Sequence, residues 1–402
     1  MDNNLPQETI QIEALPHFAL MTPDTRELAM ITLEALKLSP PLLVSSIFGL
    51  PWSWLPPYRR YSEYQIANLW QPLRFLRFLI NTNVPSLPFA PPTFSPPFVN
   101  EFLWQPSVIL QRPDHNGSYT SFLDESWFFV NGIMTNSAVA QINAAYLAYL
   151  FHRPITLVQN ATSSLWLDLL QCAIGKQWRK ITEPAVKAMP AIYDALKDKS
   201  KERVVVIAHS QGTIVMATVL DLLYQITKRQ KHLKEELLSA RAAALPYASP
   251  VFVYPDEEPL NLGDFEPLTE KELGKLEVYS FATCANAMSW FRPPSKQSPP
   301  IPWIEHFGNE QDLVARLGMI APNLERHPIF IDGPRYMRKG AWGHLLNEHY
   351  LYPIEQQQRK GRKHGGQGNP APFELLPVSG PIAEQIGAMP RLYTYLNGGR
   401  HS

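Results

Sequence analysis

The sequence has few cysteines, no net charge and no long hydrophobic run. Its two cysteines, Cys172 and Cys284, are too few to form a disulfide scaffold in 402 residues. The 36 basic residues balance the 36 acidic ones, which excludes a general electrostatic attraction to nucleic acid or anionic lipid. No apolar run reaches the roughly 18 residues of a membrane-spanning helix, and the residues after Met1 lack a secretory-signal profile. We therefore expect a cytoplasmic protein.

Proline, in contrast, is abundant and unevenly distributed. Of the 39 prolines, 17 lie in residues 1–120 and only 3 lie in residues 121–240. The first segment also carries many aromatic residues, which favours an ordered N-terminal arm packed on the core over a disordered tail. Hydrophobic residues make up 45% of the chain, enough for a large core, so we expect most regular structure after residue 120.

Short apolar runs alternate with helical patterns over residues 121–355. This alternation predicts an α/β fold with a mostly parallel central sheet and helices on both faces. The strongest strand signal lies at residues 204–208, which are all apolar and mostly β-branched, as is typical of a strand buried on both faces. Further strands are expected at residues 127–130, 154–158, 277–282, 301–307 and 328–331, and helices at residues 138–151, 165–178, 186–196 and 212–238.

Two other segments depart from this alternation. Residues 245–276 are rich in proline and acidic residues, and we expect an excursion from the core that could serve as a lid. Within it, Thr269 and Glu272 have the spacing of a capping box, which predicts the start of a short helix. Residues 356–402 begin with a tract rich in Gln, Arg, Lys and Gly, and we expect them to form a loop and tail.

A serine lies where the strand at residues 204–208 is expected to meet the long helix that follows. The segment is Ala-His-Ser-Gln-Gly, with Ser210 at its centre. A sharp turn here would hold the hydroxyl oxygen clear of the backbone, and the small residues on either side would let strand and helix approach closely. The helix N-terminus would offer backbone N–H groups to an oxyanion. The segment resembles the nucleophile elbow of the α/β-hydrolase superfamily, in its Ala-x-Ser-x-Gly variant. The alternative is a serine that caps a helix in an unrelated α/β protein.

The resemblance covers residues 121–355 and implies an oxyanion hole. Residues 128–134 are similar to the loop after the third strand of the family, with Asn131 in place of a common histidine. By position, the donors would be the backbone N–H groups of Ile133 and Gln211, with Met134 as the alternative to Ile133. A backbone donor needs no particular side chain, so the change at Asn131 is compatible with this role.

The superfamily has the chain order serine, acid, histidine, so both partners of Ser210 should follow it. The acid is expected after the strand at residues 301–307, which makes Asp312 the first choice, with Glu310 as a nearby rival. Asp332 follows one expected strand too late, and it would fit only if the strand count were off by one. Helix capping is the alternative role of Asp312.

Two histidines after the last expected strand are candidates for the base. His344 follows a glycine and opens a helix, which is how the family often presents its base, so we prefer it. His349 lies five residues further, on another helix face, and remains the alternative. His209 is adjacent to Ser210, where side chains diverge, so it is expected to line the site or pack. The other histidines after Asp312 lie in expected loops, in the tail or before a strand: His327, His364 and His401.

The resemblance therefore implies a serine hydrolase that cleaves carboxylic esters, as an esterase or lipase, through an acyl-enzyme intermediate. The alternatives are a thioesterase, amidase or acyltransferase with the same triad, and a non-catalytic binding or scaffold protein with the same fold. The sequence has no metal-ligand spacing and no Gly-rich phosphate loop, so we expect no metal and no cofactor. We expect a small-molecule or lipid ester as substrate and no nucleic-acid partner. Residues 73–80 could contact a lipid interface, or pack on the core with their arginines reaching solvent.

Overall fold

The structure, a computed structural model of the chain, describes most of the expected core. It describes Tyr61, Glu63, Thr135 and residues 108–111, 122–132, 137–160, 183–228, 264–320, 329–356, 372–386 and 389–401. The expected helix at residues 165–178, the segment at residues 73–80 and residues 245–263 of the excursion lie outside the described residues. None of the helices in the described ranges combines the length and the apolar composition needed to cross a bilayer.

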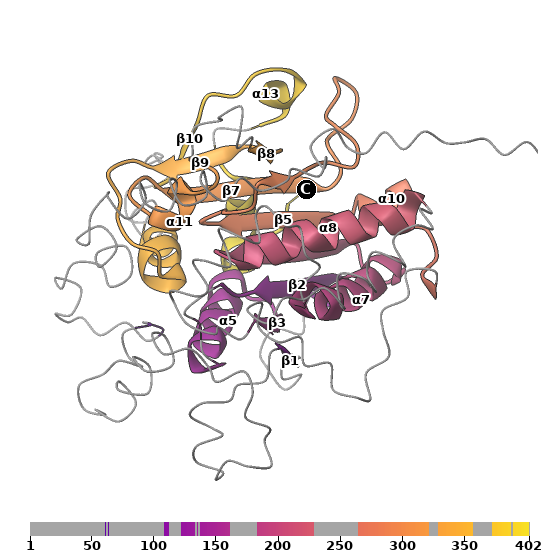
Figure 1. Cartoon of the computed structure of the whole chain (residues 1–402), viewed down its shortest axis with the longest axis horizontal. Helices are drawn as coiled ribbons and strands as arrows, with labels where there is room; N and C mark the ends of the chain where they lie inside the picture. The colour runs from indigo at the N-terminus through magenta and orange to yellow at the C-terminus, as the bar shows by residue number, and fades with distance from the viewer. Residues whose placement is uncertain are drawn as a thin grey trace, which may run out of the picture.

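An eight-stranded sheet forms the centre of the described part of the chain (Figure 1). Its strand order is β1-β3-β2-β4-β5-β7-β9-β10. The inner strands from β3 to β9 run parallel, whereas β1 and β10 are antiparallel edge strands. The strands are β1 (Val108–Gln111), β2 (Glu125–Val130), β3 (Ile155–Asn160), β4 (Arg203–His209), β5 (Leu276–Phe281), β7 (Trp303–Asn309), β9 (Arg335–Arg338) and β10 (Glu374–Leu375). The protein is an α/β protein with a mostly parallel sheet, as the sequence predicts.

Strand β4 lies in the middle of the sheet because its side chains are apolar on both faces. Val204, Val206 and Ala208 belong to the core on one face. Val205 and Ile207 belong to the core on the other face, and all five residues are fully buried. Helices α7 (Glu183–Lys197) and α8 (Gly212–Lys228) pack on the first face, and α5 (Ser137–Phe151), the π-helix η7 (Leu346–Leu351) and the 3-10 helix η8 (Arg391–Gly398) pack on the second.

One predicted strand lies outside the main sheet. The strand expected at residues 328–331 is the two-residue β8 (Phe330–Ile331), which pairs with β6 (Ala287–Met288) in a separate two-stranded sheet. The strand that lies beside β7 is β9, which the sequence analysis did not predict. Its sequence is RYMR and only Tyr336 is fully buried, so it lacks the apolar run that marks a core strand.

The sheet also extends beyond the boundaries expected for the core. β1 lies within the N-terminal arm expected at residues 1–120, and β10 lies within the tail expected at residues 356–402. The predicted capping box is confirmed: Thr269 N donates to Glu272 Oε2 (2.7 Å), and Glu272 N donates to Thr269 Oγ1 (3.2 Å). It opens α10 (Glu270–Leu273), which leads directly into β5, so the end of the expected excursion belongs to the core.

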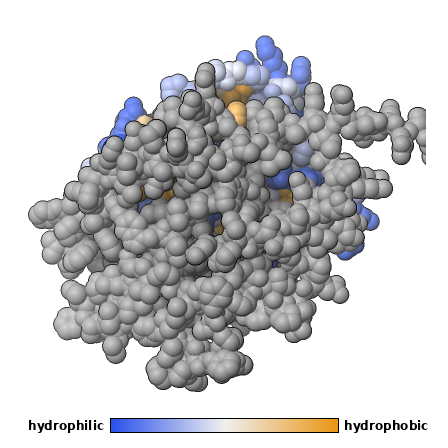
Figure 2. Space-filling view, viewed as in Figure 1, coloured by the Kyte–Doolittle hydropathy of each residue, from blue (hydrophilic) through white to orange (hydrophobic). Residues whose placement is uncertain are grey.

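The described surface around α13 (Pro381–Gln385) is mainly hydrophilic. Along the upper rim of the space-filling view, around α13, hydrophilic side chains surround a small hydrophobic area (Figure 2). Within α13, Ile382 is the buried residue, as expected for a short surface helix with one apolar contact to the core. The large hydrophobic side chains that are exposed among the described residues are Leu123, Tyr149, Trp342 and Met389. Single exposed apolar residues of this kind are ordinary on protein surfaces.

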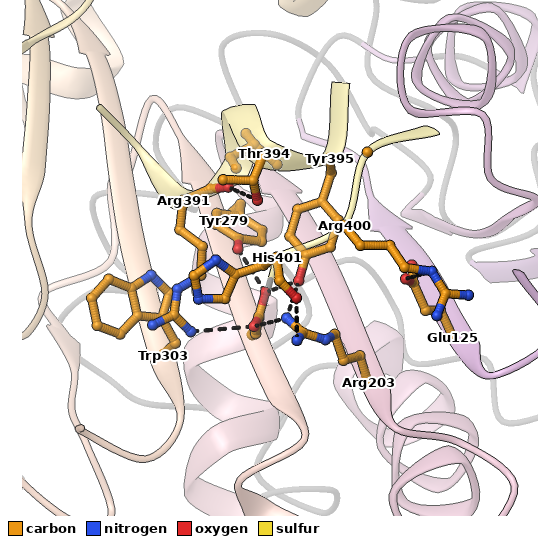
Figure 3. A network of polar contacts seen from close by, with 12 residues as sticks. Glu125, Arg203, Tyr279, Trp303, Arg391, Thr394, Tyr395, Arg400 and His401 are labelled. Atoms are coloured by element: carbon orange, nitrogen blue, oxygen red, sulfur yellow. Dashed lines mark hydrogen bonds and ion pairs between the residues drawn. The ribbon is translucent and has the colours of Figure 1, made fainter. Parts of the chain in front are cut away.

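Buried glutamates near the beginnings of three strands fix the C-terminal segment to the sheet. They are Glu125 on β2, Glu277 on β5 and Glu305 on β7. Glu277 accepts a hydrogen bond from Tyr395 Oη (2.7 Å) and lies 3.3 Å from both Arg203 and Arg391. Figure 3 shows Tyr395 and His401 of the C-terminal segment beside Arg203, whereas the side chain of Arg391 lies at Trp303. If the C-terminal segment packed elsewhere, the buried charge of Glu277 would lose its partners from that segment. These contacts therefore specify where the C-terminal segment packs.

Replacement of Glu305 should change how stability depends on pH. Burial raises the pKa of Glu305 from its usual 4.5 to about 7, although hydrogen bonds from the backbone of Arg391 and Leu392 oppose the shift. The folded state therefore binds this proton more tightly than the unfolded state, so Glu305 lowers the free energy of unfolding as pH rises from about 4.5 to about 7. We expect Glu305→Gln to lose this decline in urea unfolding measured across that range. Parallel pH dependences for variant and wild type would contradict the assignment.

Candidate active site

Ser210 occupies a sharp turn between β4 and α8. Its φ angle of +56° lies in the left-handed region that non-glycine residues rarely adopt, at a cost of about 1–3 kcal/mol. Two backbone hydrogen bonds hold the turn: Ser210 N donates to Phe281 O (2.9 Å), and Ser210 O accepts from Thr213 N (2.9 Å). The strand, turn and helix are therefore present as predicted, with Ser210 at the tip.

Two glycines let the loop after β2 approach this turn closely. A Cβ atom on Gly132 would lie 2.4 Å from Ser210 Cβ, and one on Gly212 would lie 2.3 Å from the carbonyl oxygen of Val130. Both distances are well below van der Waals contact, so a larger residue at either position would displace the backbone. Because β2 and β4 are neighbouring parallel strands, their carboxyl ends bring Gly132 and Ser210 together.

His344 and Asp312 complete a hydrogen-bonded chain with Ser210. His344 Nε2 lies 2.9 Å from Ser210 Oγ, and His344 Nδ1 lies 2.9 Å from Asp312 Oδ2. An ionised carboxylate only accepts hydrogen bonds, so Nδ1 carries the proton and Nε2 is left to accept from the Ser210 hydroxyl. All three side chains are buried. The structure thus brings together the three residues that the sequence analysis preferred.

Asp312 is held in place by further hydrogen bonds. It precedes α11 (Leu313–Arg316) and caps it, because its Oδ1 accepts from Val314 N (2.8 Å). Tyr350 Oη donates to Asp312 Oδ2 (2.6 Å) and also accepts from Asn309 N (3.2 Å). Capping and contact with His344 are therefore both roles of Asp312. Tyr350 was not predicted, because no feature of the local sequence LNEHYL distinguishes it from a tyrosine that only packs in the core.

The electrostatics of this buried pair favour an ionised acid beside a basic histidine. Burial works to raise the pKa of Asp312, but the charge of His344 and hydrogen bonds from His344, Tyr350 and Val314 outweigh it and lower the pKa. Burial likewise works to lower the pKa of His344, and the charge and hydrogen bond of Asp312 outweigh it and raise the pKa. A protonated His344 is therefore stabilised, which a general base requires as it takes up a proton.

His209 supports His344 from the end of β4. The two ring centroids lie 4.7 Å apart, and His209 Nε2 donates to the carbonyl oxygen of His344 (2.9 Å). Burial, together with the positive charge of His344, lowers the pKa of His209 to about 3. A neutral His209 packs against the candidate base, in agreement with the packing role that its position beside Ser210 predicts.

The alternative acids and base make other hydrogen bonds. His349 Nδ1 accepts from Leu345 N (2.9 Å), so this ring supports the backbone that follows His344. The ring also packs on Gly343, where an added Cβ would lie 2.3 Å from it. Among the carboxylates, Glu310 Oε2 accepts from Gly340 N (2.7 Å) and Asp332 Oδ2 accepts from Trp290 N (2.9 Å).

The candidate oxyanion donors are described only in part. Gln211 lies in the turn, and its carbonyl oxygen accepts from Ile214 N (2.9 Å). Its own N–H group therefore lies at the N-terminal end of α8, where an oxyanion donor is expected. Ile133 and its alternative Met134 lie outside the described residues. Asn131, directly before Gly132, is buried and donates to Gly132 O (3.1 Å), which fixes the described end of this loop.

Comparisons with known proteins add no family name to this geometry. No protein-family model matches the chain, and no curated protein matches it. Within the described ranges, no group of three or more His, Cys, Asp or Glu side chains is placed to hold a metal ion. The function is therefore inferred from the geometry of the site.

The pKa of His344 should depend on the charge of Asp312. NMR titration of the ring protons should show His344 titrating above the usual histidine value, whereas His209 should stay neutral. Asp312→Asn keeps the shape of the side chain but removes its charge, so it should lower the His344 pKa. His306, a buried histidine on β7 whose pKa burial lowers to about 4, serves as the internal control and should not change. An unchanged His344 pKa in Asp312→Asn would contradict the electrostatic account.

Proposed function

We propose that this protein is a serine hydrolase that cleaves carboxylic esters. The observation that carries the proposal is the chain of hydrogen bonds from Ser210 Oγ through His344 to Asp312. A serine hydroxyl is a weak nucleophile until a neighbouring base can take its proton. That base needs a third group that fixes its tautomer and stabilises its cation, which Asp312 does here.

The surrounding fold supports an α/β-hydrolase assignment. The serine follows a central strand of a mostly parallel sheet, at a turn with positive φ that leads into a helix. Asp312 and His344 follow it in the chain order of that superfamily. A serine that only caps a helix has no need of a buried histidine–carboxylate pair within hydrogen-bond distance, so the site favours catalysis over the capping alternative.

In the proposed acylation step, Ser210 Oγ attacks the acyl carbon of the ester while its proton passes to His344 Nε2. The resulting oxyanion would accept hydrogen bonds from the backbone N–H groups of Gln211 and Ile133, where each such donor contributes about 10² to 10³ in rate. His344 then donates its proton to the leaving alkoxide, which departs as an alcohol. The acyl group remains as an ester of Ser210.

Deacylation repeats the same steps with water as the nucleophile. The oxygen of a water molecule attacks the acyl carbon while His344 takes a proton from that water. His344 then returns the proton to Ser210 Oγ as the carboxylic acid leaves. Ser210 has no exposed surface and His344 exposes only 5% of its own, so an ester reaches Oγ only after groups over the site move. The lid expected at residues 245–276 stays a prediction for residues 245–263, which lie outside the described residues.

Substitution of the triad should separate the candidate bases. In hydrolysis of short-chain nitrophenyl esters, Ser210→Ala and His344→Ala should each lower kcat by a factor on the order of 10⁴ or more. His349→Ala should retain more activity, since it removes a hydrogen bond to Leu345 N and packing on Gly343 but leaves His344 opposite Ser210 Oγ. The exposed Glu384→Gln is a matched surface control, and circular dichroism checks that each variant folds.

Two results would overturn this assignment. Full activity in Ser210→Ala would exclude Ser210 as the nucleophile. Loss of activity in His349→Ala with retention in His344→Ala would move the base to His349.

A parallel panel of esters, thioesters and amides with one common acyl group determines which leaving group the site prefers. It therefore separates the esterase from the thioesterase and amidase alternatives.

A further inference from the structure

Two residues of the N-terminal arm contact the segment that follows the proposed base. Glu63 Oε1 accepts from Asn347 N (3.1 Å), and Glu63 Oε2 accepts from Glu348 N (3.1 Å). The carbonyl oxygen of Tyr61 accepts from Asn347 Nδ2 (2.8 Å), and Tyr61 N donates to Tyr352 Oη (3.2 Å). These contacts join parts of the chain that are nearly 300 residues apart in sequence.

The position of the Glu63 carboxyl explains why this contact matters. The first N–H groups of a helix have no partner within the helix. Asn347 and Glu348 lie in the first turn of η7, and Leu345 before it makes no side-chain capping bond. Glu63 therefore supplies both acceptors from a distant part of the chain. The helix that it caps begins directly after His344 and Leu345.

Glu63 is also too deeply buried to be an ordinary surface contact. It exposes only 5% of its surface. Burial raises the pKa of Glu63 to about 8, with a further contribution from the negative charge of Glu348. In either protonation state both carboxyl oxygens keep lone pairs that can accept from an N–H group. The side-chain amide of Asn143 on α5, oriented to donate, lies 3.0 Å from Glu63 Oε1.

Aromatic packing fixes the arm beside this carboxyl. The ring of Tyr61 stacks on Tyr146 of α5 at a centroid distance of 5.3 Å, and Tyr146 packs against Tyr352 at 4.8 Å. α5 follows the loop that contains Gly132, and η7 follows His344. Tyr61 and Glu63 thus contact the elements that follow Gly132 and His344, both of which lie beside Ser210.

We propose that Glu63 is a positioning residue for His344, through which the N-terminal arm sets the geometry of the proposed catalytic base. The proposal rests on the proposed function. Glu63 holds the start of η7, His209 holds the carbonyl oxygen of His344, and Asp312 holds its ring. With Glu63 removed, the backbone after His344 keeps the hydrogen bond from Leu345 N to His349 but loses both acceptors at the start of η7, and Nε2 moves from its position opposite Ser210 Oγ.

Kinetic constants of Glu63 variants test this proposal. Misplacement of a catalytic group by about 1 Å can lower a rate on the order of 10²-fold, so Glu63→Ala should lower kcat by about that factor and leave KM nearly unchanged. Glu63→Gln keeps one acceptor oxygen and should recover part of the loss. Glu384→Gln, which alters an exposed glutamate on α13, should match the wild type.

Hydrogen exchange gives a readout that does not depend on hydrolysis. In Glu63→Ala, the amides of Asn347 and Glu348 should exchange faster, while those of β4 should keep wild-type protection. Faster exchange with an unchanged kcat would contradict the positioning role and leave Glu63 a purely structural cap. Unchanged exchange would contradict the anchor itself. If the wild type neither hydrolyses esters nor reacts at Ser210, the proposed function fails, and the exchange data still show whether Glu63 anchors η7.

Discussion

The placement of the His344 imidazole is the constraint on which the rest of the site depends. Its two ring nitrogens lie within hydrogen-bond distance of Ser210, which follows β4, and of Asp312, which follows β7. The parallel sheet provides part of this arrangement, because the carboxyl ends of its strands meet at one edge. Buried hydrogen bonds provide the remainder: Phe281 holds the serine turn, Tyr350 holds the carboxylate and His209 holds the backbone of the histidine itself. Each partner is thus held by other groups of the protein, which is the preorganisation that the proposed hydrolase mechanism requires.

Buried ionisable groups have different roles at the two ends of the strands. At the carboxyl ends, Asp312 is ionised beside His344, and the neighbouring His209 stays neutral because burial lowers its pKa. Near the beginnings of the strands, the buried Glu277 pairs with Arg391 and Tyr395 of the C-terminal segment and with Arg203 of β4 (Figure 3). Buried ion pairs add little net stability but strongly disfavour arrangements that leave one partner unpaired. The second cluster therefore specifies how the chain end packs, and the first holds a proton between His344 Nδ1 and Asp312.

Sequence patterns predicted those parts of the molecule that depend on local signals. The run at residues 204–208, the Ser210 turn and the Thr269 capping box are each encoded within a few residues, and all three are present. β9 was not predicted because its sequence, RYMR, lacks the apolar run of a core strand. Its pairing with β7 is what makes it a strand. Tyr350 and Glu63 were missed for the same kind of reason: their roles come from partners 38 and more than 280 residues away, which no local pattern contains. The proximity of Ser210, His344 and Asp312 was predicted because a family resemblance supplied their chain order, and their role as a catalytic triad stays a prediction.

The most direct test of the central claim is labelling with a fluorophosphonate, followed by intact-mass measurement and peptide mapping. The account predicts a single adduct on Ser210 that is absent in Ser210→Ala and forms much more slowly in His344→Ala, because the hydroxyl reacts only when His344 can take its proton. Because Ser210 has no exposed surface, the labelling is repeated in detergent to give the reagent access to it. No adduct on folded protein under either condition, or an adduct on a different serine, would contradict an activated nucleophile at this turn.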